Sequence, residues 1–173
     1  MPLQTIQGTK VPSVISKQQI EVAVDRAKDL MLQAGIDSDV TYDDFVDWFE
    51  SEVPVPDIEI GDAVLDPLLV VHELAEIHEV LQMGLELSKE VLERNRDKVW
   101  AAHLKALATE MKVAKSVQAA EHMKSRLGTI QQCCMDSRLP SDLRSEYRKL
   151  LQTTKRALSD LKQQGAPSSS IRP

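Results

Sequence analysis

Aromatic residues are scarce in this chain: Phe, Trp and Tyr together make up 3% of its 173 residues. Its core must therefore be built from aliphatic side chains. The strands of β-sandwiches favour aromatic and β-branched residues, whereas aliphatic side chains suit helices that pack on other helices. Hydrophobic residues at 42% and charged residues at 28% lie near the averages of globular proteins, so disorder is not expected. The composition predicts an all-α protein.

Cysteine is equally scarce. The two cysteines, Cys133 and Cys134, are adjacent, and no CxxC pair provides a zinc framework. Long hydrophobic runs are missing too, because no segment approaches the roughly 18 apolar residues of a membrane span. Residues 1–14 lack the basic start and the apolar stretch of a secretory signal. We therefore expect no membrane partner and a cytoplasmic location.

The net charge of −6 is unevenly distributed. Residues 1–66 hold 4 basic and 14 acidic side chains, whereas residues 138–173 hold 8 basic and 3 acidic ones. An acidic front and a basic end can attract each other within one subunit or between two. A homodimer is expected on other grounds, because a helical hairpin cannot bury both of its apolar stripes alone. Contact of the basic C-terminal helix with nucleic acid stays open but is less favoured, because that segment carries a single aromatic residue, Tyr147.

Two helices are expected in the first third of the chain, and the second of them is short. Ser16 with Gln19 forms a capping box that begins the first helix, which Gly35 ends. Thr41 with Asp44 begins the second helix in the same way. Its aromatic side chains share one face and form a knob that packs either into its own bundle or onto a neighbouring subunit: Phe45, Trp48 and Phe49.

A long antiparallel helical hairpin is predicted to follow. Asp66-Pro67 is a strong helix start, and the apolar pattern continues to about residue 95. After a turn near residue 96, a second run covers 97–127, with Gly128 as its end, unless the helix continues to about Asp136. The predicted architecture is a helical bundle around this hairpin, flanked by N-terminal and C-terminal helices.

A single helical domain is expected over residues 1–164. It includes an irregular lead-in at 1–15 and an extended strap at 50–66, where Pro54 and Pro56 prevent a helix. The last helix begins after Pro140 and ends at Gly165, and residues 165–173 are predicted to be a disordered tail.

The segment from Val71 to Glu79 has the clearest chemical character. His72 and Glu76 are four residues apart, so their side chains meet on one helix face and can share a divalent metal ion. The pattern resembles half of a zincin helix, with Glu76 in place of the second His of H-E-x-x-H. The favoured alternative is a solvated acidic face, because both residues are predicted opposite the apolar stripe.

The second helix of the hairpin offers further ligands. The predicted register sets Glu121 and His122 opposite His72, while His103, Glu110 and Glu121 line one edge of the apolar stripe. A site that combines His72, Glu73 or Glu76 with Glu121 or His122 suits Zn or Mn. With an open coordination position, it suits hydrolysis of a phosphate ester. His78, in contrast, falls inside the apolar stripe and is predicted to be a core histidine with Gln118 as its partner.

A second catalytic pattern starts at the turn of the hairpin. Arg96-Asp97 followed by His103 resembles, over eight residues, the signature of the HEPN ribonucleases, which are all-helical dimers. The resemblance implies metal-independent cleavage of RNA, with His103 as the acid/base and Arg96 holding the phosphate. The alternative is a surface arginine at a turn and a histidine at a boundary between helices.

Three functions are therefore carried forward. The preferred one is a helical interaction or scaffold protein that self-associates, without chemistry or a cofactor of its own. The second is a phosphate-ester hydrolase with Zn or Mn at the His/Glu site of the 66–95 helix. The third is a HEPN-like ribonuclease. The identity of a substrate or partner does not follow from the sequence.

Overall fold

The computed structural model describes residues 15–51 and 60–164, and within these ranges it contains eight helices and no strand. The all-α class is confirmed. The helices are α1 (Lys17–Gln33), α2 (Tyr42–Glu50), α3 (Ile60–Ala63), α4 (Pro67–Gln82), α5 (Lys89–Arg94), α6 (Arg96–Ser116), α7 (Ala120–Met135) and α8 (Arg144–Gln164). The remaining parts of the predicted lead-in and strap, and the predicted tail, lie outside the described residues.

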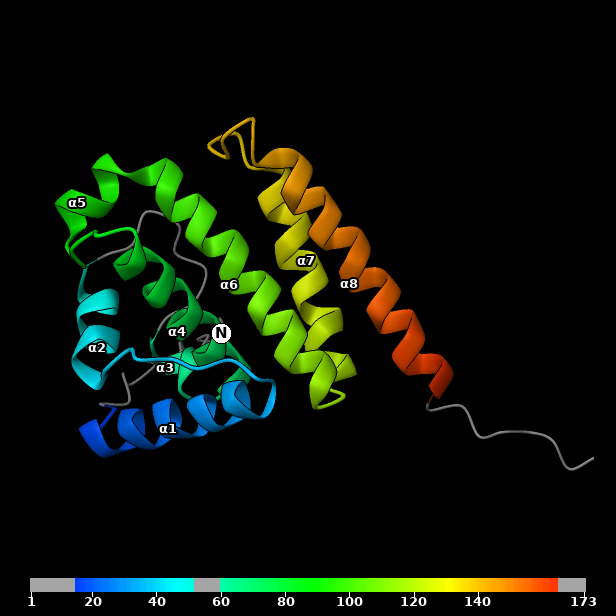
Figure 1. The fold of residues 1–173 in the computed structure, drawn as a ribbon, viewed down its shortest axis with the longest axis horizontal. Helices are drawn as coiled ribbons and strands as arrows, with labels where there is room; N and C mark the ends of the chain where they lie inside the picture. The colour runs from blue at the N-terminus through cyan, green and yellow to red at the C-terminus, as the bar shows by residue number, and fades with distance from the viewer. Residues whose placement is uncertain (1–14, 52–59, 165–173) are drawn as a thin grey trace, which may run out of the picture.

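Two groups of helices pack on either side of a central pair (Figure 1). Helices α4 and α6 pack against each other in the middle. Helices α1 and α2 cover α4 on one side, and the hairpin of α7 and α8 covers α6 on the other. Both central helices are consequently enclosed by neighbours, which decides the surroundings of every polar side chain they carry.

The predicted helix starts are confirmed by their caps. The side chains of Ser16 and Thr41 each accept a hydrogen bond from the backbone N–H three residues on, and both capping boxes are complete. Asp66 caps α4 by accepting from the N–H of Leu68, and Pro67 occupies the first helical position. The local signals therefore determine where the first, second and fourth helices begin.

The two long helices of the predicted hairpin are each interrupted. The first ends at Gln82 because Gly84 adopts a left-handed conformation with φ of 70°. The N–H groups of Gly84 and Leu85 then bond to the carbonyl groups of Leu81 and Val80, in a Schellman motif. After the turn, α5 covers only Lys89–Arg94, and Ser88 is its N-cap rather than part of an apolar stripe.

The second interruption falls at Gln118, where α6 ends in the same motif with φ of 57°. A left-handed conformation is uncommon for a residue with a β-carbon, so the sequence gives no glycine signal here. Gly128, predicted as a helix end, instead lies inside α7, which continues to Met135 as the alternative boundary predicted. Within the predicted strap, residues 60–63 form the short helix α3 rather than extended chain.

The antiparallel pairing of α4 and α6 is consistent with the predicted hairpin, but its register differs. His72 lies opposite Glu110, about ten residues before the predicted partners Glu121 and His122. The chain reverses over the whole segment between Gln82 and Arg96 rather than at a tight turn near residue 96. The opposing positions on α6 therefore move by nearly three turns of helix.

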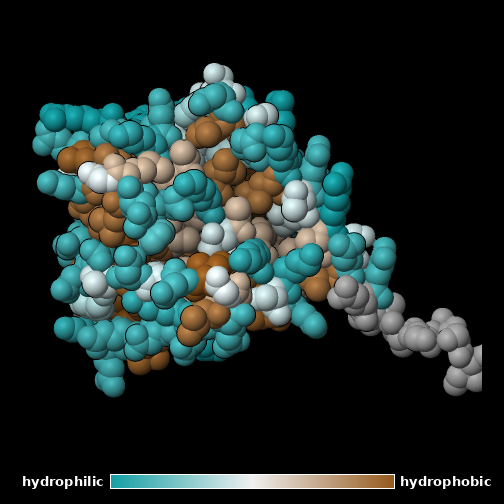
Figure 2. Space-filling view, in the orientation of Figure 1, coloured by the Kyte–Doolittle hydropathy of each residue, from teal (hydrophilic) through white to brown (hydrophobic). Residues whose placement is uncertain are grey.

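The aromatic knob packs into its own bundle. Phe45 and Trp48 are fully or almost fully buried, and the indole Nε1 of Trp48 donates to Glu73 of α4. Phe45 and Trp48 are thus part of the core, whereas Phe49 is half-buried and packs against it. Figure 2 shows the viewed face as mostly hydrophilic, with apolar residues gathered between the hydrophilic ones across its middle. In the described part of the chain, no helix has the length and apolar character needed to cross a membrane.

The central position of α6 predicts the effect of a core truncation. Leu107 has no exposed surface, so Leu107→Ala should lower the free energy of unfolding by roughly 2–5 kcal/mol. Leu32 is 66% exposed, and Leu32→Ala should change this free energy by less than about 0.5 kcal/mol. Urea unfolding followed by circular dichroism measures both values, and equal costs for the two variants would contradict the packing.

Candidate metal centre

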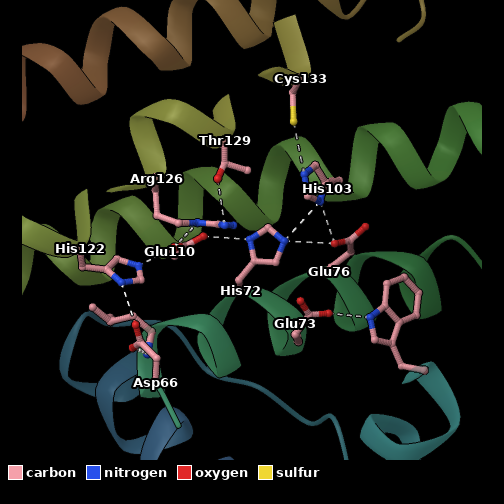
Figure 3. A network of polar contacts seen from close by, with 12 residues as sticks. Asp66, His72, Glu73, Glu76, His103, Glu110, His122, Arg126, Thr129 and Cys133 are labelled. Carbon is pink, nitrogen blue, oxygen red and sulfur yellow. Dashed lines mark hydrogen bonds and ion pairs between the residues drawn. The ribbon is translucent and has the colours of Figure 1, made fainter. Parts of the chain in front are cut away.

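Three buried side chains converge between α4 and α6: His72 and Glu76 from α4, and His103 from α6 (Figure 3). Glu76 Oε2 lies 3.0 Å from His103 Nδ1 and 3.3 Å from His72 Nε2. The two ring nitrogens are themselves 3.3 Å apart. Three atoms that commonly bind metal ions thus form a small, nearly equilateral triangle.

The burial of this group corrects the predicted solvated face. His72 and His103 have no exposed surface, and Glu76 is 2% exposed. Ten of the residues of α4 are buried, because α1 and α2 cover one side of the helix while α6 covers another. The side opposite the apolar stripe therefore faces α6 instead of water. Polar side chains enclosed in this way must find partners inside the protein.

The other ring nitrogen of His72 is held by a second layer of charged groups. His72 Nδ1 lies 3.0 Å from Glu110 Oε2. Glu110 Oε1 in turn lies 2.6 Å from His122 Nε2 and 2.8 Å from Arg126 Nε. His122 extends the chain of contacts to Asp66, with its Nδ1 3.0 Å from the Asp66 carboxylate. The network runs from the partly exposed N-cap of α4 into the centre of the bundle (Figure 3).

His103 is fixed by α7 and by aromatic rings. Its Nε2 lies 3.8 Å from the Sγ atom of Cys133 on α7. The imidazole stacks on the ring of Tyr147 and meets the edge of Trp100, and Tyr147 Oη donates to the backbone carbonyl of Trp100. Two of the chain's six aromatic residues therefore enclose one candidate ligand, which holds its ring in place.

The pKa values of the buried acidic and basic groups in the centre are shifted by their opposite charges. Burial alone would raise the pKa of Glu76, but the charge and hydrogen bond of His103 hold this pKa well below its ordinary value. Burial alone would lower the pKa of His103, yet the facing Glu76 carboxylate raises it to about 10. Glu110 follows the same logic: burial opposes its ionisation, while His122, His72 and Arg126 lower its pKa. Without a metal ion, a proton on His103 supplies the positive charge that the carboxylates require.

One carboxylate oxygen in the centre has no partner. Glu76 Oε1 is buried, and no described residue makes a hydrogen bond to it. An ionised oxygen without a hydrogen bond costs free energy that a native structure normally avoids. Glu76 Oε1 can therefore still accept a hydrogen bond or bind a cation.

The sequence-predicted ligands lie in different parts of the structure, and only two of them belong to the centre. His72 and Glu76 belong to the centre, and His122 reaches it only through Glu110. Glu73 is buried but bonds to Trp48 on the side of α2. Glu121 points into solvent with an 89% exposed side chain and faces Lys124. The predicted register, about ten residues away from the observed one, explains why Glu121 was placed opposite His72.

The other two histidine predictions also have clear outcomes. His78 is not a core residue: it is about one third exposed, and its Nδ1 lies 3.0 Å from Asp39 instead of near Gln118. Of the two residues of the ribonuclease pattern, Arg96 lies at the surface, 42% exposed, and pairs with Glu93. His103 instead has no exposed surface and faces Glu76.

Sequence reasoning missed the link between His103 and the metal candidates, and the roles of Glu110, Arg126 and Cys133. A signal was present for two of them, because His103 and Glu110 share the edge of the apolar stripe on the second helix. Arg126 and Cys133 lie on α7, whose contact with α6 depends on the unexpected turn at Gln118.

A search against models of known families, curated protein sequences and solved structures found no significant match to this chain.

The buried ion pair predicts how the stability of the metal-free protein depends on pH. The pKa of Glu76 is lowered on folding from 4.5 to about 2, so its contribution is present above about pH 4.5 and is lost as the pH falls toward 2. The pKa of His103 is raised from 6.5 to about 10, so its contribution is complete below about pH 6.5 and is lost as the pH rises toward 10. Urea unfolding in the presence of a chelator, at a series of pH values, measures both limbs.

A histidine variant isolates the alkaline limb. His103→Gln should remove much of the decline between about pH 6.5 and 10, because the titrating group is gone. His78→Gln, which changes a partly exposed histidine, should keep that decline. An alkaline limb that is identical in His103→Gln and the unmodified protein would contradict the assignment of the positive charge to His103.

Proposed function

We propose that this chain is a divalent-metal-binding helical protein, in which His72 Nε2, His103 Nδ1 and Glu76 Oε2 hold one Zn²⁺ or Mn²⁺ ion. The spacing of these three atoms carries the proposal. Metal–ligand bonds of about 2.0–2.1 Å place tetrahedral ligand atoms about 3.3 Å apart, and adjacent octahedral ones about 3.0 Å apart. The three distances of 3.0, 3.3 and 3.3 Å fall in this range.

The surroundings of the two histidines support the proposal independently. Histidine ligands of metal ions usually donate their other ring N–H to a carboxylate or a similar acceptor, which fixes the tautomer. His72 has Glu110 in this position, and His103 has the sulfur of Cys133. With both outer N–H groups donated, two nitrogen lone pairs and a carboxylate point at one place. A cation is the group that such a set of acceptors attracts.

The proposed role of the ion is structural. The three ligands have exposed fractions of 0%, 2% and 0%, so a substrate of ordinary size has no access to them in this conformation. A bound ion would join α4 to α6 at the centre of the bundle.

We therefore keep the scaffold interpretation, now as a metal-stabilised interaction protein that self-associates in the cytoplasm. The two free cysteines support a reducing compartment, and sedimentation velocity tests the proposed homodimer.

Metal analysis and stability together test this proposal. The purified chain should retain about one ion per molecule, and Zn²⁺ or Mn²⁺ added to the metal-free protein should stabilise it. At a free metal concentration one hundred times the Kd, the gain in unfolding free energy should be about 2.7 kcal/mol. His72→Ala and Glu76→Gln should each abolish this gain. Elemental analysis and chemical unfolding with and without metal give both readouts.

Two further variants separate metal binding from general damage. His78→Ala should keep the full metal-dependent gain, because His78 lies outside the centre and pairs with Asp39. Glu110→Gln should lower the metal affinity about ten- to a hundredfold, since it removes the charged acceptor behind His72. The absence of bound metal, together with no stabilisation by either ion, would reject the proposal.

The hydrolase alternative is favoured by one observation. Three protein ligands leave a coordination position open, as in catalytic zinc sites, and Glu76 Oε1 has no partner among the described residues. If the ion acts in hydrolysis, the metal-loaded protein should cleave bis(p-nitrophenyl) phosphate, and His72→Ala should lose this activity while His78→Ala keeps it. The structural role instead predicts no turnover above that of His72→Ala. The release of p-nitrophenol, followed by absorbance, decides between the two.

A further inference from the structure

An apolar groove lies between α6, α7 and α8, away from the candidate metal centre. Its volume is about 280 Å³. Met111 and Met123 form its floor, and Leu150 and Ala157 of α8 form one wall. Apolar pockets between helices are ordinary sites for small molecules, and their volumes begin near 300 Å³. This groove lies at the small end of that range.

Two lysines stand at the rim of the groove. Lys112 and Lys115 are both exposed residues of α6, and both line the cavity. No described residue forms an ion pair with either of them, and no acidic side chain lines the groove. The apolar interior therefore has a positive border on one side without a counter-charge. This combination complements a molecule with an apolar body and an anionic end.

A buried hydroxyl group provides a second, independent observation. Thr154 lines the groove and is 2% exposed, and its Oγ1 has no hydrogen-bond partner among the described residues. A threonine in a helix is divided between two χ1 rotamers, so its hydroxyl and methyl groups can exchange places. A carboxylate bound within reach of Thr154 would offer the hydroxyl the acceptor that it lacks.

We propose that this groove binds a medium-chain fatty acid, with the alkyl chain between the methionines of α6 and α7 and the carboxylate between Lys112 and Lys115. The volume favours a small molecule over a protein partner, because an amphipathic helix needs a groove several turns long. The proposal is independent of the metal centre, since none of the residues that hold the proposed ion lines this groove.

Calorimetric titration of the full chain with decanoate, below the concentration at which it forms micelles, tests the proposal. We expect saturable binding with one molecule per chain. The double variant Lys112→Glu/Lys115→Glu should weaken it at least tenfold, and it should gain binding of decyltrimethylammonium, whose head is positive. Ala157→Phe, which fills the groove from α8, should abolish the binding of both amphiphiles.

A matched control keeps the charge change and moves it elsewhere. Lys98→Glu/Lys124→Glu changes the net charge by the same amount at two exposed lysines outside the groove, and it should bind decanoate as the unmodified chain does. Thr154→Val, which has the same shape as threonine, should weaken binding less than the lysine pair does. Circular dichroism confirms that each variant is folded.

Several outcomes would overturn the proposal. Decanoate binding that is absent, or that is equal in Ala157→Phe and in the unmodified chain, would show that the groove takes no fatty acid. If decanoate does not bind and Ala157→Phe alters the sedimentation coefficient, the groove is an interface between copies of the chain. If an acidic amphipathic peptide binds in its place with the same lysine dependence, the occupant is a protein segment.

Discussion

The contact between α4 and α6 depends on a network of buried charges. Glu76, Glu110 and Arg126 are almost fully buried. Removing each charge from water costs several kcal/mol unless interactions with opposite charges inside the protein offset this cost. The compensation comes from close opposite charges. His103 of α6 faces Glu76 of α4 at 3.0 Å, and His122 and Arg126 of α7 face Glu110 of α6 at 2.6 and 2.8 Å. Because the network has members on α4, α6 and α7, pairing its charges favours this arrangement of the three helices. Breaking one pair would leave an uncompensated charge in the core, which is far more costly than the pair itself is stabilising.

The apolar layers around the network make its geometry possible. Helix α4 is covered by α1 and α2, so water has no direct path to His72 or Glu76 from that side. On the far side, Trp100 and Tyr147 enclose His103. In a medium of low polarity, opposite charges at 3 Å interact strongly, which explains the pKa changes of opposite sign at Glu76 and His103. The same enclosure favours a tightly bound ion over an exchanging one and limits what chemistry the centre could perform.

Local signals in the sequence predicted most of the fold, and their range explains what they missed. Ser16, Thr41 and Asp66 mark helix starts through contacts within three residues, which a sequence pattern can show directly. Gly84 is a possible stop signal that the sequence prediction passed over, because the apolar pattern across it favoured a continuous helix. Gln118 gave no stop signal, because a left-handed glutamine depends on the tertiary packing of α6 against α7. The pairing of α4 with α6 depends on how the chain reverses between them, so the two interruptions together displaced the predicted ligand set. His72 and Glu76 could be predicted as a pair because they lie on one helix. The third member, His103, lies on α6, so predicting it requires the correct register between α4 and α6.

The separation of the ligands along the chain gives the proposed ion a topological consequence. Glu76 and His103 are 27 residues apart, and the turn, α5 and the first part of α6 lie between them. An ion held at both positions closes this stretch into a loop, as a crosslink would. In the chain-entropy account of crosslinks, a loop of that length restricts the open chain by about 3.5 kcal/mol. Such a crosslink would be reversible. The concentration of free metal ion would then determine how often the segment between Glu76 and His103 unfolds locally, independently of the rest of the bundle.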